Sequence, residues 1–332
     1  WLSGNNLSDL TYISWDAKDS WVSDSYYWLF FNIALCNEFL RHCSDEEIAR
    51  FSEAEQTEIR TFRSEARFMR SFSYWMVLDL YRQGPKVDEN TPVIGYIPEA
   101  YDGIGMFDFI ESELKELVAE GVSSALPATN EYGRASKPVA WALLARLYLN
   151  SAVYRGNVDT KYYTECITAC KQVISNPAFY LEPEYAKLFN ADNHKRTHEI
   201  LFAMVCDATT SVTWGGGTYI ICGNSSTQDP AKYGLSNGWG MFRARGEMTA
   251  KFGDIATTKD SRAMFYTDGQ AQFFTGAIDN QAEGYFFEKF SNLTDEGVAA
   301  SNSAATGCST DYPLLRLADI YLMAAEAQLR GG

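Results

Sequence analysis

The sequence predicts a mainly α fold, in which a tetratricopeptide-like scaffold of helix pairs (αα-hairpins) is accompanied by a loop-rich, irregular half. Residues 62–81 contain no Gly or Pro and are apolar on nearly every side, and such a helix must pack between neighbours. Residues 132–174 read as two helices and a tight turn, which is an αα-hairpin. Residues 209–240 are rich in Gly, Ser, Thr and Asn with interleaved aromatics, which argues against disorder.

The composition limits the classes of ligand. Hydrophobic residues are 46% and charged residues 21% of the 332-residue chain, as in a globular protein with a sizeable core. A net charge of −15 disfavours nucleic acid and anionic lipid and favours a neutral ligand. Aromatic residues reach 14%, which fits either a well-filled core or exposed rings that stack on sugar. No run approaches the ~20 apolar residues of a membrane-spanning helix.

The cysteines and histidines predict neither a cofactor nor a metal. The seven cysteines lie at positions 36, 43, 166, 170, 206, 222 and 308. They contain no Cys-x-x-Cys, so we expect no zinc knuckle or redox motif. Cys166 and Cys170 are four apart on a predicted helix and are expected in the core. His194 and His198 share that spacing, but no third ligand accompanies them.

The chain opens with a predicted loop and a helix. Residues 1–24 are polar and aromatic without a sustained period, so we expect a long loop that carries Trp15 and Trp21. Because loops run over the surface, these two indoles are candidates for an exposed role. Residues 25–41 are predicted as a helix. One apolar stripe of this helix consists of Trp28, Phe31, Leu35 and Phe39.

A charged segment, 44–58, precedes the central helix. Its acidic run from Asp45 suits the first turn of a helix. The central helix, 62–81, is expected to end at Gly84-Pro85. Its first apolar stripe is Phe62, Ala66, Met69, Met76 and Leu80, and its second is Phe68, Phe72 and Trp75.

The next helices form the predicted pair. After an irregular link over 85–105, residues 106–120 show an amphipathic pattern whose acids lie on a solvated face. The stretch 132–154 contains a strong predicted helix, in which Pro138 is tolerated because it lies in the first turn. Residues 159–174 form its partner, and Gly156-Asn157 makes the turn.

The pattern then changes. Residues 199–207 read as a short strand, and 209–240 as a long segment without regular structure. Residues 312–330 are predicted as a last helix. We expect one domain over 1–332, with the helical scaffold at about 25–198 and 311–330 and the loop-rich part at about 1–24 and 199–310.

Several blocks, in order, resemble one family. They read YWLFFNIALCNEFL from Tyr27, EARFMRSFSYWMVLDLYRQGPKV from Glu65, GRASKPVAWALLARLYL from Gly133, EILF from Glu199, DSR from Asp260 and YPLLRLADIYLMAAEA from Tyr312. Together they resemble the SusD/RagB family, the glycan-binding outer-membrane lipoproteins of Bacteroidetes. The family's lipoprotein signal, first helix and C-terminal part have no counterpart in the chain, so the resemblance covers a middle fragment.

The resemblance implies a place and a partner. Family members are surface-exposed proteins held in the outer membrane by a lipid anchor, which this chain lacks. They sit as a lid on a TonB-dependent transporter of the SusC type. The resemblance therefore implies a non-catalytic protein that captures oligosaccharides or polysaccharides and delivers them to that transporter. Nucleic acid is not an expected partner.

The resemblance also indicates where sugar would bind. A flat aromatic ring matches the apolar C–H face of a sugar, and amide, carboxylate and guanidinium groups match its hydroxyls. In the family, aromatic residues come from the loop before the early helix and from the region after the EILF strand. The corresponding aromatic candidates are Trp15, Trp21, Trp214, Tyr219, Tyr233 and Trp239, and the polar candidates are Asp16, Asn224, Asn237 and Arg243. Each ring has a competing interpretation as packing that anchors a loop.

Two other functions stay open. A helical-repeat adaptor that binds only protein would explain the αα-hairpins, and its aromatic loops should then be buried against the scaffold. A glycoside hydrolase would need two carboxylates that face each other across a cleft. The sequence contains 43 acidic residues and singles out no such pair.

Overall fold

The computed structural model describes residues 7–210, 216–224, 229–276, 280–300 and 307–332. The fold is mainly α, as predicted, with a few short strands. The chain divides into two compact units. We call residues 3–179 with 317–332 the helical unit, and residues 180–316 the loop-rich unit. In the described part of the chain, no helix combines the length and apolar character needed to cross a membrane.

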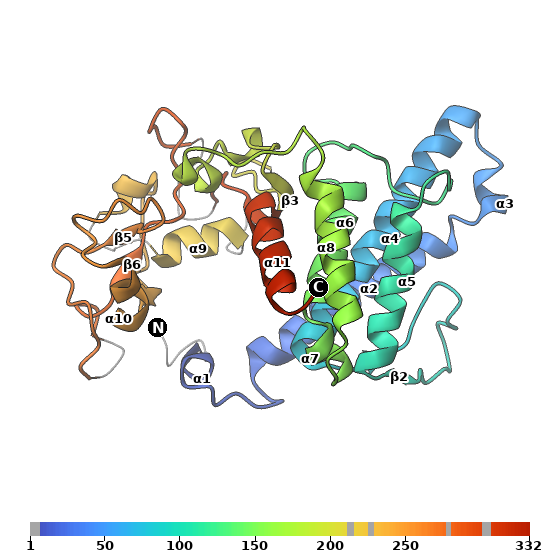
Figure 1. Cartoon of the computed structure of the whole chain (residues 1–332), viewed down its shortest axis with the longest axis horizontal. Helices are drawn as coiled ribbons and strands as arrows, with labels where there is room; N and C mark the ends of the chain where they lie inside the picture. The colour runs from blue at the N-terminus through green and yellow to red at the C-terminus, as the bar shows by residue number, and fades with distance from the viewer. Residues whose placement is uncertain (1–6, 211–215, 225–228, 277–279, 301–306) are drawn as a thin grey trace. The chain divides into compact units, whose positions relative to one another are not determined.

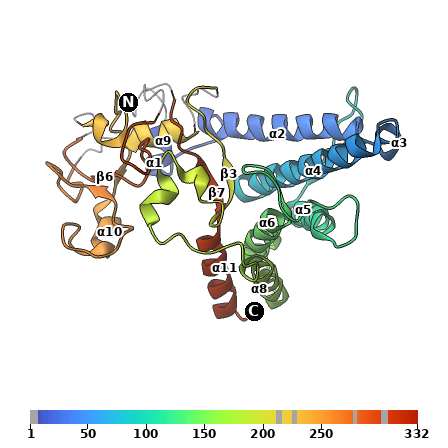
Figure 2. The ribbon, with the colours of Figure 1, turned by 90° about the horizontal axis from the view of Figure 1, so that it is seen from above.

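The helical unit is built on the antiparallel helices α2 (Ser20–Arg41) and α4 (Glu53–Tyr81), which run alongside each other in Figure 2. The short helices α1 (Leu7–Tyr12) and α3 (Asp45–Ile48) flank α2. The prediction of a loop over residues 1–24 was therefore wrong in part. Asp19 caps α2, because its carboxylate accepts the backbone N–H groups of Trp21 and Val22 at 2.8 and 3.2 Å.

Helix α4 is central, as predicted, and packs against α2, α3, α5 and α6. It begins at a capping box between Ser52 and Glu55 and ends where Arg82 takes a left-handed conformation. It is not covered on every side. The buried residues include Phe68, Phe72 and Tyr74, whereas Phe62, Met69 and Leu80 of the first predicted stripe are 36%, 38% and 56% exposed.

The predicted helix pair is present. Helix α6 (Lys137–Leu149) packs against α8 (Thr160–Ile174), and the two lie side by side in Figure 1. Gly156 ends the short helix α7 (Ser151–Arg155) in a left-handed conformation and starts the turn. Helix α5 (Gly103–Val118) lies between α4 and α6, and α11 (Leu317–Leu329) covers α8. The hairpin of β1 (Gly84–Pro85) and β2 (Ala100–Tyr101) joins α4 to α5.

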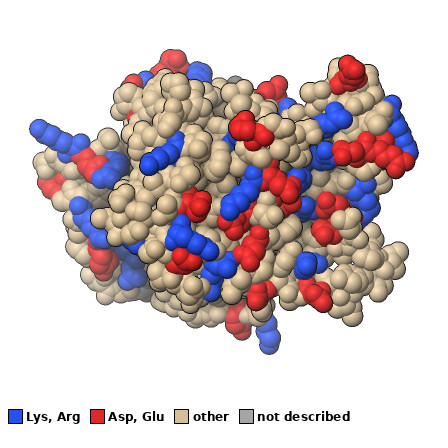
Figure 3. Space-filling model, turned by 45° about the vertical axis from the view of Figure 1, so that its right-hand side comes forward, with Lys and Arg blue, Asp and Glu red and all other residues tan. Residues whose placement is uncertain are grey.

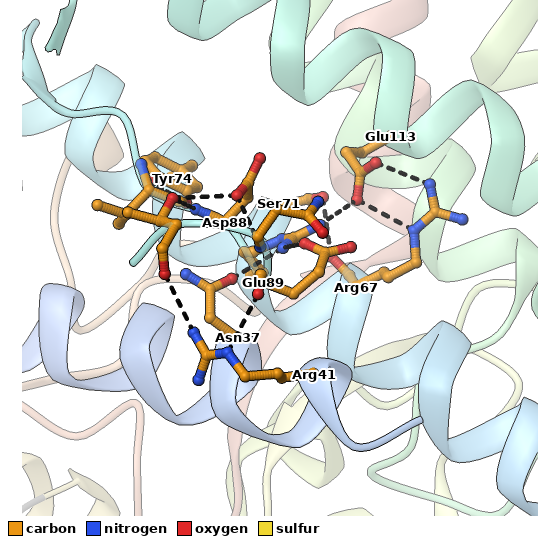
Figure 4. A network of polar contacts seen from close by, with 12 residues as sticks. Asn37, Arg41, Arg67, Ser71, Tyr74, Asp88, Glu89 and Glu113 are labelled. Carbon is orange, nitrogen blue, oxygen red and sulfur yellow. Dashed lines mark hydrogen bonds and ion pairs between the residues drawn. The ribbon is translucent and has the colours of Figure 1, made fainter. Parts of the chain in front are cut away.

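A buried charge network joins α2, α4 and α5 (Figure 4). Arg70 of α4 is 2% exposed. Its guanidinium donates hydrogen bonds to Asn37 of α2 at 2.8 Å, to Glu89 at 2.5 Å and to Glu113 of α5 at 3.0 Å. Arg67 forms a second ion pair with Glu113 at 2.7 Å. Because buried charges are tolerated only when paired, this network fixes how the three helices meet.

The loop-rich unit contains two small sheets. Strand β3 (Ile200–Met204) pairs antiparallel with β7 (Tyr312–Arg316), from Ile200 opposite Arg316 to Met204 opposite Tyr312. The second sheet has the order β4-β6-β5. The strands of this sheet are β4 (Arg243–Ala244), β5 (Phe265–Tyr266) and β6 (Tyr285–Phe287).

Two predictions about this unit were wrong. The last helix begins at Leu317 and not at Tyr312, because Pro313 favours an extended backbone before it and the segment pairs with β3. The segment 209–240 is not without regular structure. It contains the helix α9 (Gly216–Asn224) and the 3₁₀ turn η3 (Pro230–Tyr233), and Ile221 of α9 is fully buried.

Short elements complete the unit. They are η1 (Tyr185–Phe189), η2 (Asn193–Lys195), α10 (Gly246–Thr249) and η4 (Ala250–Phe252). The core of the unit includes Phe189, Phe202, Phe286 and Leu315.

Candidate functional site

The loop-rich unit positions an aromatic cluster at the end of α9. The last carbonyl groups of a helix lack partners within it. Here the carbonyl oxygen of Cys222 accepts the N–H of Trp239 at 2.7 Å, and that of Gly223 accepts the N–H of Phe242 at 2.9 Å. These hydrogen bonds attach the segment 239–242 to the C-terminal end of α9.

This contact brings three rings together. The Tyr219 ring of α9 lies 5.8 Å from Trp239 in an edge-to-face arrangement and 5.5 Å from Phe242. Gly223 makes the approach possible, because a Cβ there would lie 2.5 Å from the Phe242 ring. Tyr219, Trp239 and Phe242 are all partly exposed, and partial burial raises the pKa of the Tyr219 hydroxyl above its ordinary value. We call these three residues the α9 aromatic cluster.

The polar candidates near the cluster in sequence differ in exposure. Asn237 is exposed, two residues before Trp239. Asn224, the last residue of α9, is 7% exposed. A sugar hydroxyl can reach an exposed amide without disturbing the fold. Of these two asparagines, only Asn237 is therefore accessible to a ligand.

Two of the sequence candidates have structural partners. Tyr233 is 3% exposed and donates a hydrogen bond to Glu288 at 3.0 Å. Burial, followed by the charge of Glu288, raises the pKa of the Tyr233 hydroxyl. The guanidinium of Arg243 donates to the carbonyl oxygen of Glu283 at 2.5 Å and lies over the Phe274 ring. Both side chains hold the loop-rich unit together, which gives each of them a structural role.

The helical unit holds the other candidates. Trp15 is 47% exposed and Trp21, in the first turn of α2, is 41% exposed. Asp16 is exposed and accepts the N–H of Lys18 at 2.7 Å, which tightens the turn before α2. Asp19 is 6% exposed because it caps α2. Trp214, the remaining candidate, lies outside the described residues.

The structure adds aromatic surfaces that the sequence did not single out as sites. In the loop-rich unit, Tyr180 is 57% exposed and stacks on His198, with ring centres 4.2 Å apart. On α2, the stripe predicted from the sequence points to solvent. The exposed fractions of the four stripe residues are 59% for Trp28, 42% for Phe31, 53% for Leu35 and 40% for Phe39. The adjacent Tyr27 is 64% exposed. No local signal separates this stripe from a core stripe.

Metal and charge features are limited. Among the residues that the structure describes, no three His, Cys, Asp or Glu side chains gather as a metal site. His198 instead contacts Glu182 at 3.1 Å. Acidic and basic side chains alternate over the face seen in Figure 3, so this face offers no broad patch of one sign.

Comparison with known proteins identifies relatives along the whole chain. The SusD family model matches residues 261–332. The chain is 29% identical to the starch-binding protein SusD of Bacteroides thetaiotaomicron, over 100% of the chain and 65% of that protein. It is 25% identical to SusD-like protein P2 of Formosa agariphila, over 82% of the chain and 53% of that protein. The chain thus spans less than two thirds of the length of these relatives.

Solved structures share the fold. A SusD superfamily protein from Parabacteroides distasonis superimposes with a TM-score of 0.75 at 21% identity, over 98% of this chain and 66% of that one. A surface glycan-binding protein A from Bacteroides thetaiotaomicron, in complex with laminarihexaose, gives a TM-score of 0.69 at 16% identity, over 92% and 64% of the two chains. At these identities the likeness concerns the fold alone.

Proposed function

We propose that the chain is a member of the SusD/RagB family, and that it is a non-catalytic, glycan-binding surface protein that captures oligosaccharides or polysaccharides. The observation that carries this proposal is the α9 aromatic cluster, which presents partly exposed rings and is preceded in the chain by the exposed Asn237. Rings of this kind match the apolar face of a pyranose, and an exposed amide matches its hydroxyls. The relatives support it, because one is named a starch-binding protein and another was solved with laminarihexaose.

The proposed sugar contacts form two groups. Tyr219, Trp239 and Asn237 belong to the loop-rich unit, and Trp15, Asp16 and Trp21 to the helical unit. The exposure of Trp15 and Trp21 supports a role in binding, because an adaptor with buried aromatic loops would enclose them. We further infer that the captured glycan passes to a SusC-type TonB-dependent transporter, and that the protein is held at the outer-membrane surface by a lipid anchor. These last inferences rest on family membership.

Isothermal titration with neutral oligosaccharides tests the glycan proposal. The panel contains malto-oligosaccharides, laminari-oligosaccharides and xylogluco-oligosaccharides. We expect one class to bind and the affinity to fall about fivefold in Trp239→Ala, because one aromatic contact contributes roughly 1 kcal/mol. Trp15→Ala and Trp21→Ala test the second group in the same way.

The matched control is Phe51→Ala, which removes a ring that is 49% exposed between α3 and α4. This variant should bind like the wild type. Absence of binding to every glycan class, or an equal loss in the control, would contradict the proposal. Release of reducing sugar by the wild-type protein would instead favour a hydrolase.

A further inference from the structure

Two buried cysteines meet where α9 packs against the segment before β7. The Oγ of Thr218, in α9, accepts the backbone N–H of Cys308 at 2.9 Å. Cys222 lies four residues after Thr218 and therefore on the same side of the helix. Gly217 permits the approach, since a Cβ there would overlap the carbonyl oxygen of Thr310. Cys308 is thus held against the face of α9 that carries Cys222.

The two thiols lie close together in the interior. The exposed fractions of Cys222 and Cys308 are 0% and 2%, and each thiol shifts the pKa of the other, that of Cys222 downward and that of Cys308 upward.

A third cysteine lies near this pair but is held differently. The Cys206 sulfur donates to the carbonyl oxygen of Met204, and the backbone N–H of Cys206 donates to Asp311 at 2.7 Å. Cys206 is partly exposed. Its thiol therefore serves as a neighbouring reference for the reactivity of the buried pair.

We propose that Cys222 and Cys308 form a disulfide bond in the mature protein. The two thiols give up two protons and two electrons as the S–S bond forms. The oxidant is the disulfide of a thiol–disulfide oxidoreductase, or oxidised glutathione in vitro, which accepts both and leaves as two thiols. Burial of the pair places the reaction during folding or during a transient opening of α9.

The bond would close a long loop. The segment 223–307 contains β4, β5 and β6 and the residues Asn237 and Trp239 of the proposed sugar site. Closing a loop of this length restricts the unfolded chain more than a short cross-link does. The bond would hold the end of α9 to the segment before β7 whether or not sugar is bound, so its test is independent of glycan binding.

Peptide mapping of the full chain tests the proposal. Protein exported to a bacterial periplasm, and folded reduced protein incubated with oxidised glutathione, are alkylated under denaturing conditions without reductant. Trypsin leaves Cys206 and Cys222 in one peptide, because no Lys or Arg lies between them, so chymotrypsin, which cleaves after Tyr219, is added. We expect a linked pair of peptides containing Cys222 and Cys308, and five alkylated cysteines in place of seven.

Variants provide the second readout. Cys222→Ser and Cys308→Ser should each lower the Tm by about 5–10 °C and abolish the effect of reductant on it. Cys206→Ser is the matched control and should keep both the linked peptide and the reductant effect. Seven alkylated cysteines from both preparations, or a link between Cys206 and Cys308, would overturn the proposal. Because the linkage is read on wild-type protein, the test does not require the variants to fold.

Discussion

Arg70 shows at the level of single residues how the blocks of the sequence are joined in the fold. This side chain comes from the block that begins at Glu65, and it pairs with Asn37 from the preceding block. The other blocks pair likewise. The pairs are Glu65 with Arg134, Arg146 with Asp319, and Glu199 with Arg316. The residues on which the family resemblance rests therefore hold the scaffold together, and they carry little information about the ligand.

Glu113 gives this network a pH dependence. Burial raises the pKa of the Glu113 carboxyl, but the hydrogen bonds and charges of Arg67 and Arg70 outweigh burial and lower the pKa below its ordinary value of 4.5. When the pKa of a carboxyl is lower in the folded state than in the unfolded state, its ionised form stabilises the fold. This stabilisation is complete at pH values above the unfolded-state pKa, and it is lost as the pH falls through the folded-state pKa. We expect the free energy of unfolding to decrease below about pH 4.5.

Urea unfolding of the wild type and Glu113→Gln between pH 7 and pH 3.5 checks this expectation. The variant should be less stable by about 1–3 kcal/mol at pH 7, because it loses charge-assisted hydrogen bonds. The difference from wild type should shrink toward acidic pH. Glu58→Gln, which changes an exposed carboxylate of α4, is the control. A difference that stays constant over the whole range would show that Glu113 is not held in this network.

At the scale of elements, α2 illustrates the limit of pattern reading. Its buried side carries Leu29, Ile33 and Leu40 together with the polar Asn37. Its exposed side carries the longer aromatic stripe from Tyr27 to Phe39. Both sides repeat with helical spacing, so the sequence predicts the helix and leaves open which side faces α4. The partner of Asn37, the buried Arg70, decides the orientation.

Two substitutions in α2 check this orientation. Ile33 is 0% exposed and Leu35 is 53% exposed. Ile33→Ala should lower the free energy of unfolding by about 2–5 kcal/mol, because it leaves a cavity in the core. Leu35→Ala, its matched control, should change it by less than about 0.5 kcal/mol. Urea denaturation of both variants measures these values, and comparable losses would mean that the Leu35 side is covered too.

The strands and α9 were harder to predict than the long helices. The segment Tyr312–Arg316 shares its apolar spacing with the helix that follows, and only its pairing with β3 separates the two. Helix α9 has nine residues, several of them Gly, and isolated helices of that length are marginal. Its stability comes from buried contacts such as Ile221, which are long-range and therefore absent from local sequence patterns.

For the whole molecule, the sequence indicates regions for the proposed site but not which of their rings are exposed. The pairing of Tyr219 with Trp239 depends on a contact between the end of α9 and a segment fifteen residues away. The family resemblance gave both Tyr219 and Trp239 as candidates, but it equally gave Tyr233, which the structure buries. Aromatic residues serve as core and as surface in the same unit, so exposure has to come from the fold.

The net charge of −15 leads to a prediction about ligand class. Binding of a neutral oligosaccharide should change less than about twofold between 50 and 500 mM NaCl, because no ion pairs are screened. At low salt, an acidic oligosaccharide of the same backbone should bind more weakly than the neutral one, because the negative net charge of the protein repels it. Titration of both ligands in the same protein measures the difference. Tighter binding of the acidic ligand at low salt would reveal a local attractive site.

The attachment of residues 239–242 to α9 has a consequence for how sugar specificity could change. The attachment uses main-chain N–H and carbonyl groups, which every residue except proline supplies in full. The side chains at positions 239 and 242 can therefore be substituted while the main-chain hydrogen bonds of this segment to α9 remain. Gly223 has to be retained, because a larger residue there would overlap the side chain at position 242. A new recognition surface would then arise from a few substitutions, while the ion-paired helices of the scaffold stay as they are.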